Sequence, residues 1–249
     1  MCRPNNHLQP HHHAAPDTTH THAQRKILAI HGHGANSQIT QRQIQNLRIN
    51  DKHNCKVDYL QATNLVPPND QNVKALAPPP YFSWFKFDPM ALFNGIGRKG
   101  NSLHNSIQRI LKHIEKNGPY DGIYGFSQGA VVASFLCSEV CWGKMGGMSE
   151  CPFKFAILAN AGATWTLSRC ALELPDGSIM RASLPLRLAS FHLIGAADFW
   201  HRTESKELVR AYESSLSREY THKFGHEIPM TIAWDVKLQS ELATFFKSL

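Results

Sequence analysis

The feature that most constrains this chain is a short apolar run that passes through a glycine-rich turn into a second apolar segment. Residues 120–124 have the length and composition of a buried strand, and residues 128–141 are apolar all round, as expected of a buried helix. Between them, residues 125–129 read Gly-Phe-Ser-Gln-Gly, and the two glycines allow a tight turn. A strand that leads directly into a helix is the building unit of parallel sheets, so we expect such a sheet here.

The same alternation continues along the chain. Further strands are predicted at residues 26–30, 55–60, 153–158, 190–194 and 220–225. Further helices are predicted at residues 36–49, 102–117, 204–216 and 235–248. The chain has 249 residues, of which 42% are hydrophobic, which is enough for one domain or at most two. We therefore predict an α/β fold with a mostly parallel central sheet and helices on both faces.

Residues 63–101 interrupt this rhythm. They contain five prolines before position 81 and a dense group of aromatic residues: Tyr81, Phe82, Trp84, Phe85, Phe87 and Phe93. This composition predicts a short cap or insertion in place of a regular strand–helix unit. Residues 160–188 show no clear pattern.

Residues 1–24 have a different composition from the rest. They hold six of the 15 histidines and three prolines, with almost no aliphatic side chains. Such a segment buries too little apolar surface to offset its ordering entropy, so we expect a disordered His-rich tail followed by one domain at 25–249. The segment lacks the apolar stretch of a secretory signal. No Cys/His framework gives its histidines a metal geometry, and we predict neither a metal nor another cofactor.

The net charge of +7 comes from the first half of the chain. Its basic residues are spread singly, without a Lys/Arg run, so we expect no nucleic-acid partner. No apolar stretch reaches the roughly 18 residues of a membrane span. Without a signal peptide, the six cysteines indicate reduced thiols and a cytoplasmic location. The sequence leaves the oligomeric state open.

The serine in Gly-x-Ser-x-Gly carries the chemistry. A serine on a sharp turn between a strand and a helix is the nucleophile elbow of the α/β-hydrolase fold, and its partners follow in the order Ser, Asp/Glu, His. Four histidines follow Ser127, at positions 192, 201, 222 and 226. His226 is the best general base because it follows a glycine just beyond a strand, where a loop can direct it at the serine. Asp198, at the carboxyl end of a strand, is preferred as the acid over Glu173 and Asp176.

Backbone amides are expected to bind the oxyanion. The first is that of Gln128, directly after the serine, and the second is expected in the turn at residues 31–34, where we assign it to His33. The pair His31 and His33 offers only two possible metal ligands, which again speaks against a metal.

At these residues the chain resembles the FSH family of serine hydrolases, α/β-hydrolases that include the ovarian-tumour candidate esterase. The resemblance covers roughly residues 25–248 and is strongest at Asn117–Ala130. Supporting stretches are Leu28–Gly32, Ser83–Phe85, Gly195–Asp198 and Gly225–Pro229. It implies that Ser127 is the nucleophile, Asp198 the acid and His226 the base of an enzyme that cleaves small carboxylic esters or thioesters.

Two stretches depart from the family pattern and bear on specificity. Phe199-Trp200-His201 stands where many members have a Val-Pro pair, and Phe224 replaces a second glycine before the histidine. We expect an apolar acyl pocket, and its candidate walls are Trp84, Phe85, Phe199 and Trp200. The favoured function is a serine hydrolase that works through an acyl-enzyme on Ser127. Two alternatives are a non-catalytic ligand-binding relative and an acyltransferase with the same triad.

Overall fold

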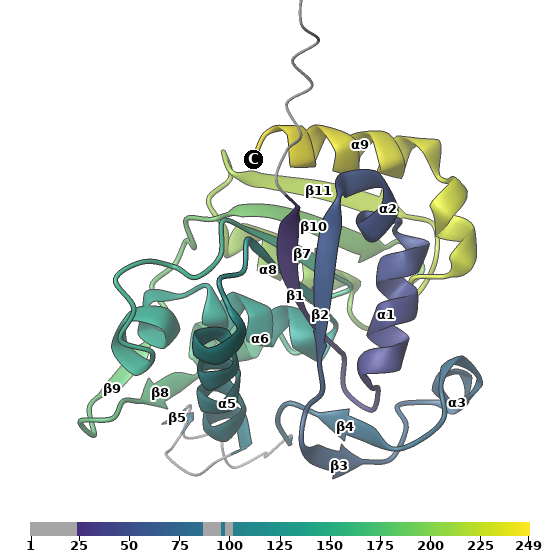
Figure 1. Cartoon of the computed structure of the whole chain (residues 1–249). Coiled ribbons are helices and arrows are strands. Elements are labelled where there is room, and N and C mark those ends of the chain that lie inside the picture. Colours follow the sequence, from purple (N-terminus) through teal and green to yellow (C-terminus); the bar gives the residue numbers. More distant parts are fainter. Residues whose placement is uncertain (1–23, 87–95, 98–101) are drawn as a thin grey trace, which may run out of the picture.

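A parallel sheet lies at the centre of the molecule (Figure 1). The computed structural model describes residues 24–86, 96–97 and 102–249. Within these residues the sheet has six strands in the order β11-β10-β7-β6-β1-β2, and every neighbouring pair is parallel. The strands are β1 (Arg25–Ile30), β2 (Cys55–Leu60), β6 (Gly122–Phe126), β7 (Phe155–Ala159), β10 (Ala189–Gly195) and β11 (Ser217–His222).

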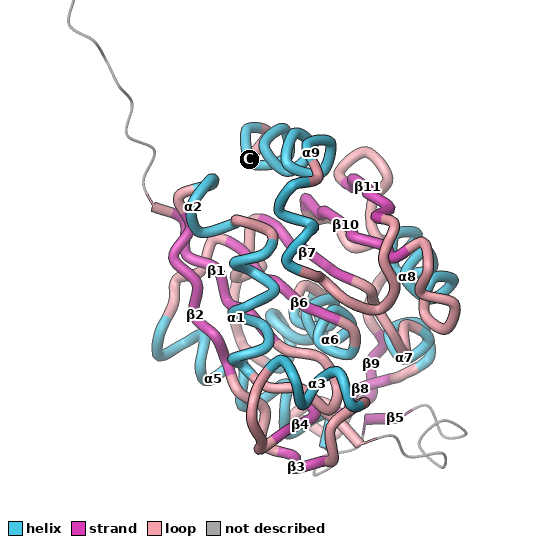
Figure 2. The backbone as a smooth tube through the Cα atoms, turned by 90° about the vertical axis from the view of Figure 1, so that its right-hand side faces the viewer, coloured by secondary structure: helices cyan, strands magenta, loops and turns pink. Residues whose placement is uncertain are grey.

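Helices cover both faces of this sheet, and each face has its own core. One face packs against α1 (Ser37–Asn46), α2 (Ile49–His53) and α9 (Val236–Lys247). Figure 2 shows α1 in front of the strands and α9 at the top of the view. The other face packs against α5 (Ser102–Asn117), α6 (Gln128–Leu136) and α8 (Arg202–Arg210). Both faces of β6 and β7 are therefore buried, which explains why these strands are apolar throughout. The predicted α/β architecture is confirmed.

Several predicted boundaries are wrong by a few residues. The expected helix at 36–49 is two helices, because Arg48 adopts a left-handed conformation with φ of 58°. The expected helix at 128–141 ends at Leu136, and the π-helical turn η1 (Val140–Met145) follows it. At this break the Ser138 hydroxyl donates to the Phe135 carbonyl, so a side chain competes for the helical backbone.

The last strand was also misplaced. β11 begins at Ser217 and α8 already ends at Arg210, whereas the apolar pattern predicted a helix to residue 216 and a strand at 220–225. β11 lies at the edge of the sheet and most of its residues are partly exposed. Its sequence therefore lacks the apolar run by which the inner strands were recognised.

The insertion after β2 forms a small layer beyond the carboxyl end of that strand (Figure 1). Strands β3 (Asn64–Val66) and β4 (Tyr81–Ser83) pair antiparallel, and α3 (Gln71–Leu76) lies between them in the chain. A second small sheet contains β5 (Ile96–Gly97), β8 (Ala171–Glu173) and β9 (Ile179–Arg181). Helix α7 (Trp165–Arg169) and the 3-10 helix η2 (Met230–Trp234) complete the elements. Phe87, Phe93 and the proposed tail lie outside the described residues, apart from Gln24.

The described helices include none that is both long and apolar enough to cross a membrane. The described cysteines are free thiols: Cys55, Cys137, Cys141, Cys151 and Cys170.

A buried histidine in β10 makes the fold sensitive to pH. His192 is 2% exposed, and burial lowers the pKa of its imidazole to about 3. In the unfolded chain the pKa of a histidine is about 6.5. Above that pH, His192 is neutral in both the folded and the unfolded chain, and its contribution to the free energy of unfolding is complete. That contribution is lost as the pH falls from about 6.5 toward 3. Between pH 7 and pH 5 the loss amounts to about 2 kcal/mol.

We therefore expect His192→Phe to reduce the acid sensitivity of the fold. Urea unfolding at pH 7 and pH 5 measures it: the variant should lose about 2 kcal/mol less free energy of unfolding than the wild type between these pH values. Equal losses in both proteins would show that His192 does not contribute to the acid sensitivity.

Candidate active site

Three loops at the carboxyl edge of the sheet bring Ser127, Asp198 and His226 together. Ser127 directly follows β6, Asp198 follows β10, and His226 follows β11. These strands are not sequential neighbours in the sheet, since β7 and β10 separate β6 from β11. The parallel arrangement nevertheless places all three loops at the same edge.

The Ser127 turn has the strained geometry expected of an elbow. Its φ is 53° and its ψ −119°, a region that residues with a side chain rarely occupy. The turn is held because Gly129 lets α6 approach the end of β1. A Cβ atom at Gly129 would lie 2.5 Å from the His31 carbonyl oxygen and 2.7 Å from that of Ile30. Gly125 is equally enclosed, with the Gly129 carbonyl oxygen 2.4 Å from the position of a Cβ.

The three side chains form one hydrogen-bonded chain. The Ser127 Oγ lies 2.9 Å from His226 Nε2, and His226 Nδ1 lies 2.6 Å from Asp198 Oδ2. With Nδ1 donating to the carboxylate, Nε2 is free to accept the serine proton. This is the geometry of an activated serine nucleophile with an oriented general base.

The Asp198 side chain is buried, but its carboxyl group still loses its proton readily. Burial by itself would raise the pKa of its carboxyl. The hydrogen bond from His226 and the His201 backbone N–H, 3.1 Å from Oδ1, outweigh burial and hold this pKa below its usual value. Asp198 is therefore ionised at neutral pH and can stabilise an imidazolium at His226.

Two residues that the sequence analysis did not assign to the site hold the loop that carries His226. The Asn160 amide donates to the Gly225 carbonyl oxygen at 2.8 Å, and its own carbonyl lies 3.1 Å from His222 Nε2. Asn160 has a positive φ of 44° directly after β7. An asparagine directly after a strand indicates a turn in the sequence, but only the structure shows that its side chain binds the loop of His226.

The two amides expected to bind an oxyanion lie in segments that are joined by side-chain hydrogen bonds. The Trp84 indole N–H donates to the His31 carbonyl oxygen at 2.7 Å, and the Trp84 backbone N–H donates to the Gln128 side chain at 2.9 Å. Gln128 in turn donates to the Phe85 carbonyl oxygen at 2.8 Å. Within the part of the chain that the structure describes, the backbone N–H groups of Gln128 and His33 have no hydrogen-bond partner. Both are therefore available to a ligand.

His31 holds the same turn from inside. Its Nδ1 donates to the Gly32 carbonyl oxygen at 2.7 Å, and its Nε2 accepts the Ala62 backbone N–H at 3.1 Å. Burial lowers the pKa of His31 to about 4, so the ring is neutral at physiological pH. His31 points into the protein while His33 is exposed, so the two imidazoles do not converge on one point. The described residues contain no group of three metal-ligating side chains.

The four aromatic residues expected to line an acyl pocket lie elsewhere. Trp84 is fully buried and Phe85 is 5% exposed, both in the core between the sheet and α5. Phe199 and Trp200 are 90% and 88% exposed. None of the four lines the cavity beside Ser127. Aromatic composition identified these positions, but it does not distinguish packing or solvent exposure from a pocket wall.

The cavity beside Ser127 has a volume of about 480 Å³. Its walls come from α1, α3 and the loop after His226, and they are mostly apolar, with Ile39, Val73 and Ile228 among them. Ser127 and His226 both line it. A small molecule in this cavity would have direct access to the Ser127 side chain.

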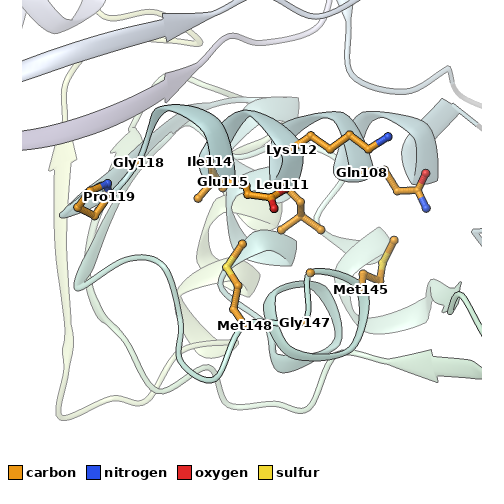
Figure 3. Close-up of a pocket in the computed structure, with 11 residues that line it drawn as sticks. Gln108, Leu111, Lys112, Ile114, Glu115, Gly118, Pro119, Met145, Gly147 and Met148 are labelled. Atoms are coloured by element: carbon orange, nitrogen blue, oxygen red, sulfur yellow. The ribbon is translucent and has the colours of Figure 1, made fainter.

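A second hollow, of about 740 Å³, is lined by residues other than Ser127, Asp198 and His226, and Figure 3 shows its lining. Its labelled residues come from α5, from Gly118 and Pro119 directly after that helix, and from the segment around Met145 and Met148. It contains no serine and no histidine, so it lacks the residues needed for the same chemistry.

The comparison with protein families identifies the chain. The model described as "Serine hydrolase (FSH1)" matches residues 20–238. The chain belongs to the FSH1 serine hydrolase family. The predicted family is therefore confirmed, and the chain is assigned to the hydrolases.

Curated relatives agree with this assignment, and solved structures agree with the fold. Esterase FPY3 of Fusarium mangiferae is 27% identical, with 82% of this chain and 88% of the relative covered. Esterase OVCA2 of Xenopus tropicalis is 26% identical, with 82% and 86% covered. The crystal structure of esterase PE8 matches with a TM-score of 0.55 at 15% identity, covering 90% of this chain and 93% of that one. Arabidopsis thaliana SOBER1 matches with a TM-score of 0.53 at 15% identity, covering 91% and 99%. These structures share the α/β-hydrolase fold.

We expect Gly129→Ala to disturb both stability and the site. Alanine is the better helix former, by about 1 kcal/mol, but its methyl group would collide with the His31 and Ile30 carbonyls. Overpacking of this kind typically costs about 1–3 kcal/mol, so the expected net loss is up to about 2 kcal/mol. The midpoint of urea unfolding and the rate of ester cleavage are measured on the same variant, and both should fall.

Gly143→Ala is the matched control. The nearest atom to its Cβ is the flexible Glu139 Cγ at 3.4 Å, so this variant should retain wild-type stability and activity. A Gly129→Ala protein as stable and active as the control would contradict the tight packing at the elbow.

Proposed function

We propose that the protein hydrolyses carboxylic esters or thioesters of small molecules through an acyl-enzyme on Ser127. The observation that carries this proposal is the continuous hydrogen-bonded chain from Ser127 Oγ through His226 to Asp198. The relatives named esterases point to the same reaction class. The proposal goes further than the family assignment because it names the nucleophile, the base and the intermediate.

The first half of the reaction forms the acyl-enzyme. His226 Nε2 takes the proton from Ser127 Oγ as that oxygen attacks the substrate carbonyl carbon. The resulting imidazolium then donates the proton to the leaving alcohol or thiol as the tetrahedral intermediate collapses. Asp198 keeps Nδ1 protonated and the ring aligned throughout.

The second half releases the acid product. Water replaces the leaving group, gives its proton to His226 and attacks the acyl carbon. The second tetrahedral intermediate expels Ser127 Oγ, which recovers its proton from the imidazolium. In both halves the amides of Gln128 and His33 would hold the oxyanion, and each such donor is typically worth about 3 kcal/mol.

The cavity favours an acyl or alcohol group with apolar surface. Its apolar walls come from α1, α3 and the segment that follows His226. The alternative of a non-catalytic binding protein rested on crowding of the site by Phe199, Trp200 and Phe224. None of the three lines this cavity, and Phe199 and Trp200 are largely exposed, so crowding does not favour that alternative. Acyl transfer to an alcohol or amine uses the same triad, and product analysis with competing nucleophiles distinguishes it from hydrolysis.

Ser127→Ala should abolish turnover. A chain-length series of p-nitrophenyl esters and acyl thioesters measures kcat/KM, which should fall by at least about 10³-fold for each substrate that the wild type cleaves. The series also shows whether the cavity prefers esters or thioesters. The exposed Ser240→Ala on α9 is the matched control and should retain full activity.

Asp198→Asn tests the orienting carboxylate in the same assay. The amide can accept or donate at His226 Nδ1, so the tautomer with a free Nε2 is no longer secured, and kcat should fall by about 10⁴-fold. Turnover that survives both Ser127→Ala and Asp198→Asn would refute the proposed mechanism.

A further inference from the structure

A second imidazole–carboxylate pair lies against the first. His201 Nδ1 is 2.5 Å from Glu204 Oε2, and the His201 ring centroid is 4.6 Å from that of His226, with an interplanar angle of 50°. The two rings are therefore in direct contact, each bonded through Nδ1 to its own carboxylate. His201 stands in the stretch where the sequence departs from the family pattern.

The surrounding backbone holds this second pair in place. The His201 N–H donates to Asp198 Oδ1, so the residue is tied to the acid of the first pair. The other oxygen of Glu204 accepts the Ala163 backbone N–H at 3.1 Å. Gly162 lies under the His201 ring, since a Cβ there would be only 3.1 Å from Nδ1. The ring thus lies between the loop after β7 and His226, and its side chain remains 37% exposed.

We propose that His201 is a positioning residue whose charge, set by its pairing with Glu204, determines the lowest pH at which His226 works as a base. The inference rests on the proposed function of His226 and deepens it. A proton on His201 places a positive charge beside His226 and disfavours a second proton on the neighbouring ring. His226 then stays neutral, and able to accept the serine proton, to a lower pH than it would alone.

The charged groups around His201 support this direction. Glu204 on α8 faces it directly, Asp198 lies in its own turn and His226 lies opposite. From the loop after β7, Gly162 and Ala163 contact the His201–Glu204 pair, and neither has a titratable side chain. The hydrogen bond to Glu204 raises the pKa of His201, although burial opposes the rise. His201 therefore binds its proton more readily than an isolated histidine does.

The experiment measures the pKa of His226 directly. NMR titration of the His226 Cε1 proton, assigned with His226→Gln, compares the wild type with His201→Phe and His201→Gln. The first variant keeps an aromatic ring and the second a polar side chain, while both remove the charge. We expect the pKa of His226 to rise by about half a pH unit in both, as expected for a unit charge about 5 Å away in a water-like medium.

The pH profile of kcat/KM provides the second readout. In both variants its acid limb should move to higher pH by the same amount, whereas a purely structural role of His201 would lower kcat/KM equally at every pH. His113→Phe is the matched control, because it removes another imidazole–carboxylate pair, that with Asp58 on the edge strand β2. It should leave the pKa of His226 unchanged.

The two failures are distinguishable. A wild-type protein without any ester or thioester turnover would refute the proposed function, while the NMR titration would still test the pairing. An unchanged pKa of His226 in both His201 variants would overturn the inference, even if the enzyme is active.

Discussion

The close approach of α6 to the end of β1 is the contact on which the site depends. Gly129 allows the helix to lie against the His31 and Ile30 carbonyls, and this approach leaves Ser127 in a strained turn above the sheet. The same contact places the first amide of α6 beside the turn at residues 31–34. One packing constraint thus positions both Ser127, the proposed nucleophile, and the amides that would receive the oxyanion.

Asp198 and His226, the proposed acid and base, come to this point through the sheet. Because the strands are parallel, the loops after β10 and β11 open at the same edge as the elbow. A short network then adjusts their positions: Asn160 and His222 hold the loop of His226, and the Trp84–Gln128 bonds join the two amide-bearing segments. Trp84 therefore serves the site as a buried support and not as a pocket wall.

The sequence predicted what local pattern encodes. The strand–turn–helix around Ser127 and the strand at residues 55–60 follow from the local residue pattern and the glycines. The motif also led to Asp198 and His226, the two residues whose side chains the fold brings to Ser127. The predicted ends of helices and strands were wrong where a side chain competes for a backbone hydrogen-bonding group, as at Ser138, or where an edge strand is polar, as in β11. The prediction of the residues that line the pocket failed for a different reason. The walls of the cavity come from α1, α3 and the segment after His226, which meet only in the folded chain. The contact between His201 and His226 is likewise tertiary, since the two residues lie on different loops.

Covalent labelling with a fluorophosphonate tests the central claim most directly, because the probe reacts with a serine only when a neighbouring base activates it. Mass mapping of the folded, labelled protein should place the phosphonyl group on Ser127, and His226→Ala should abolish the reaction. A folded wild-type protein whose Ser127 stays unlabelled, or a label that persists without His226, would contradict the account.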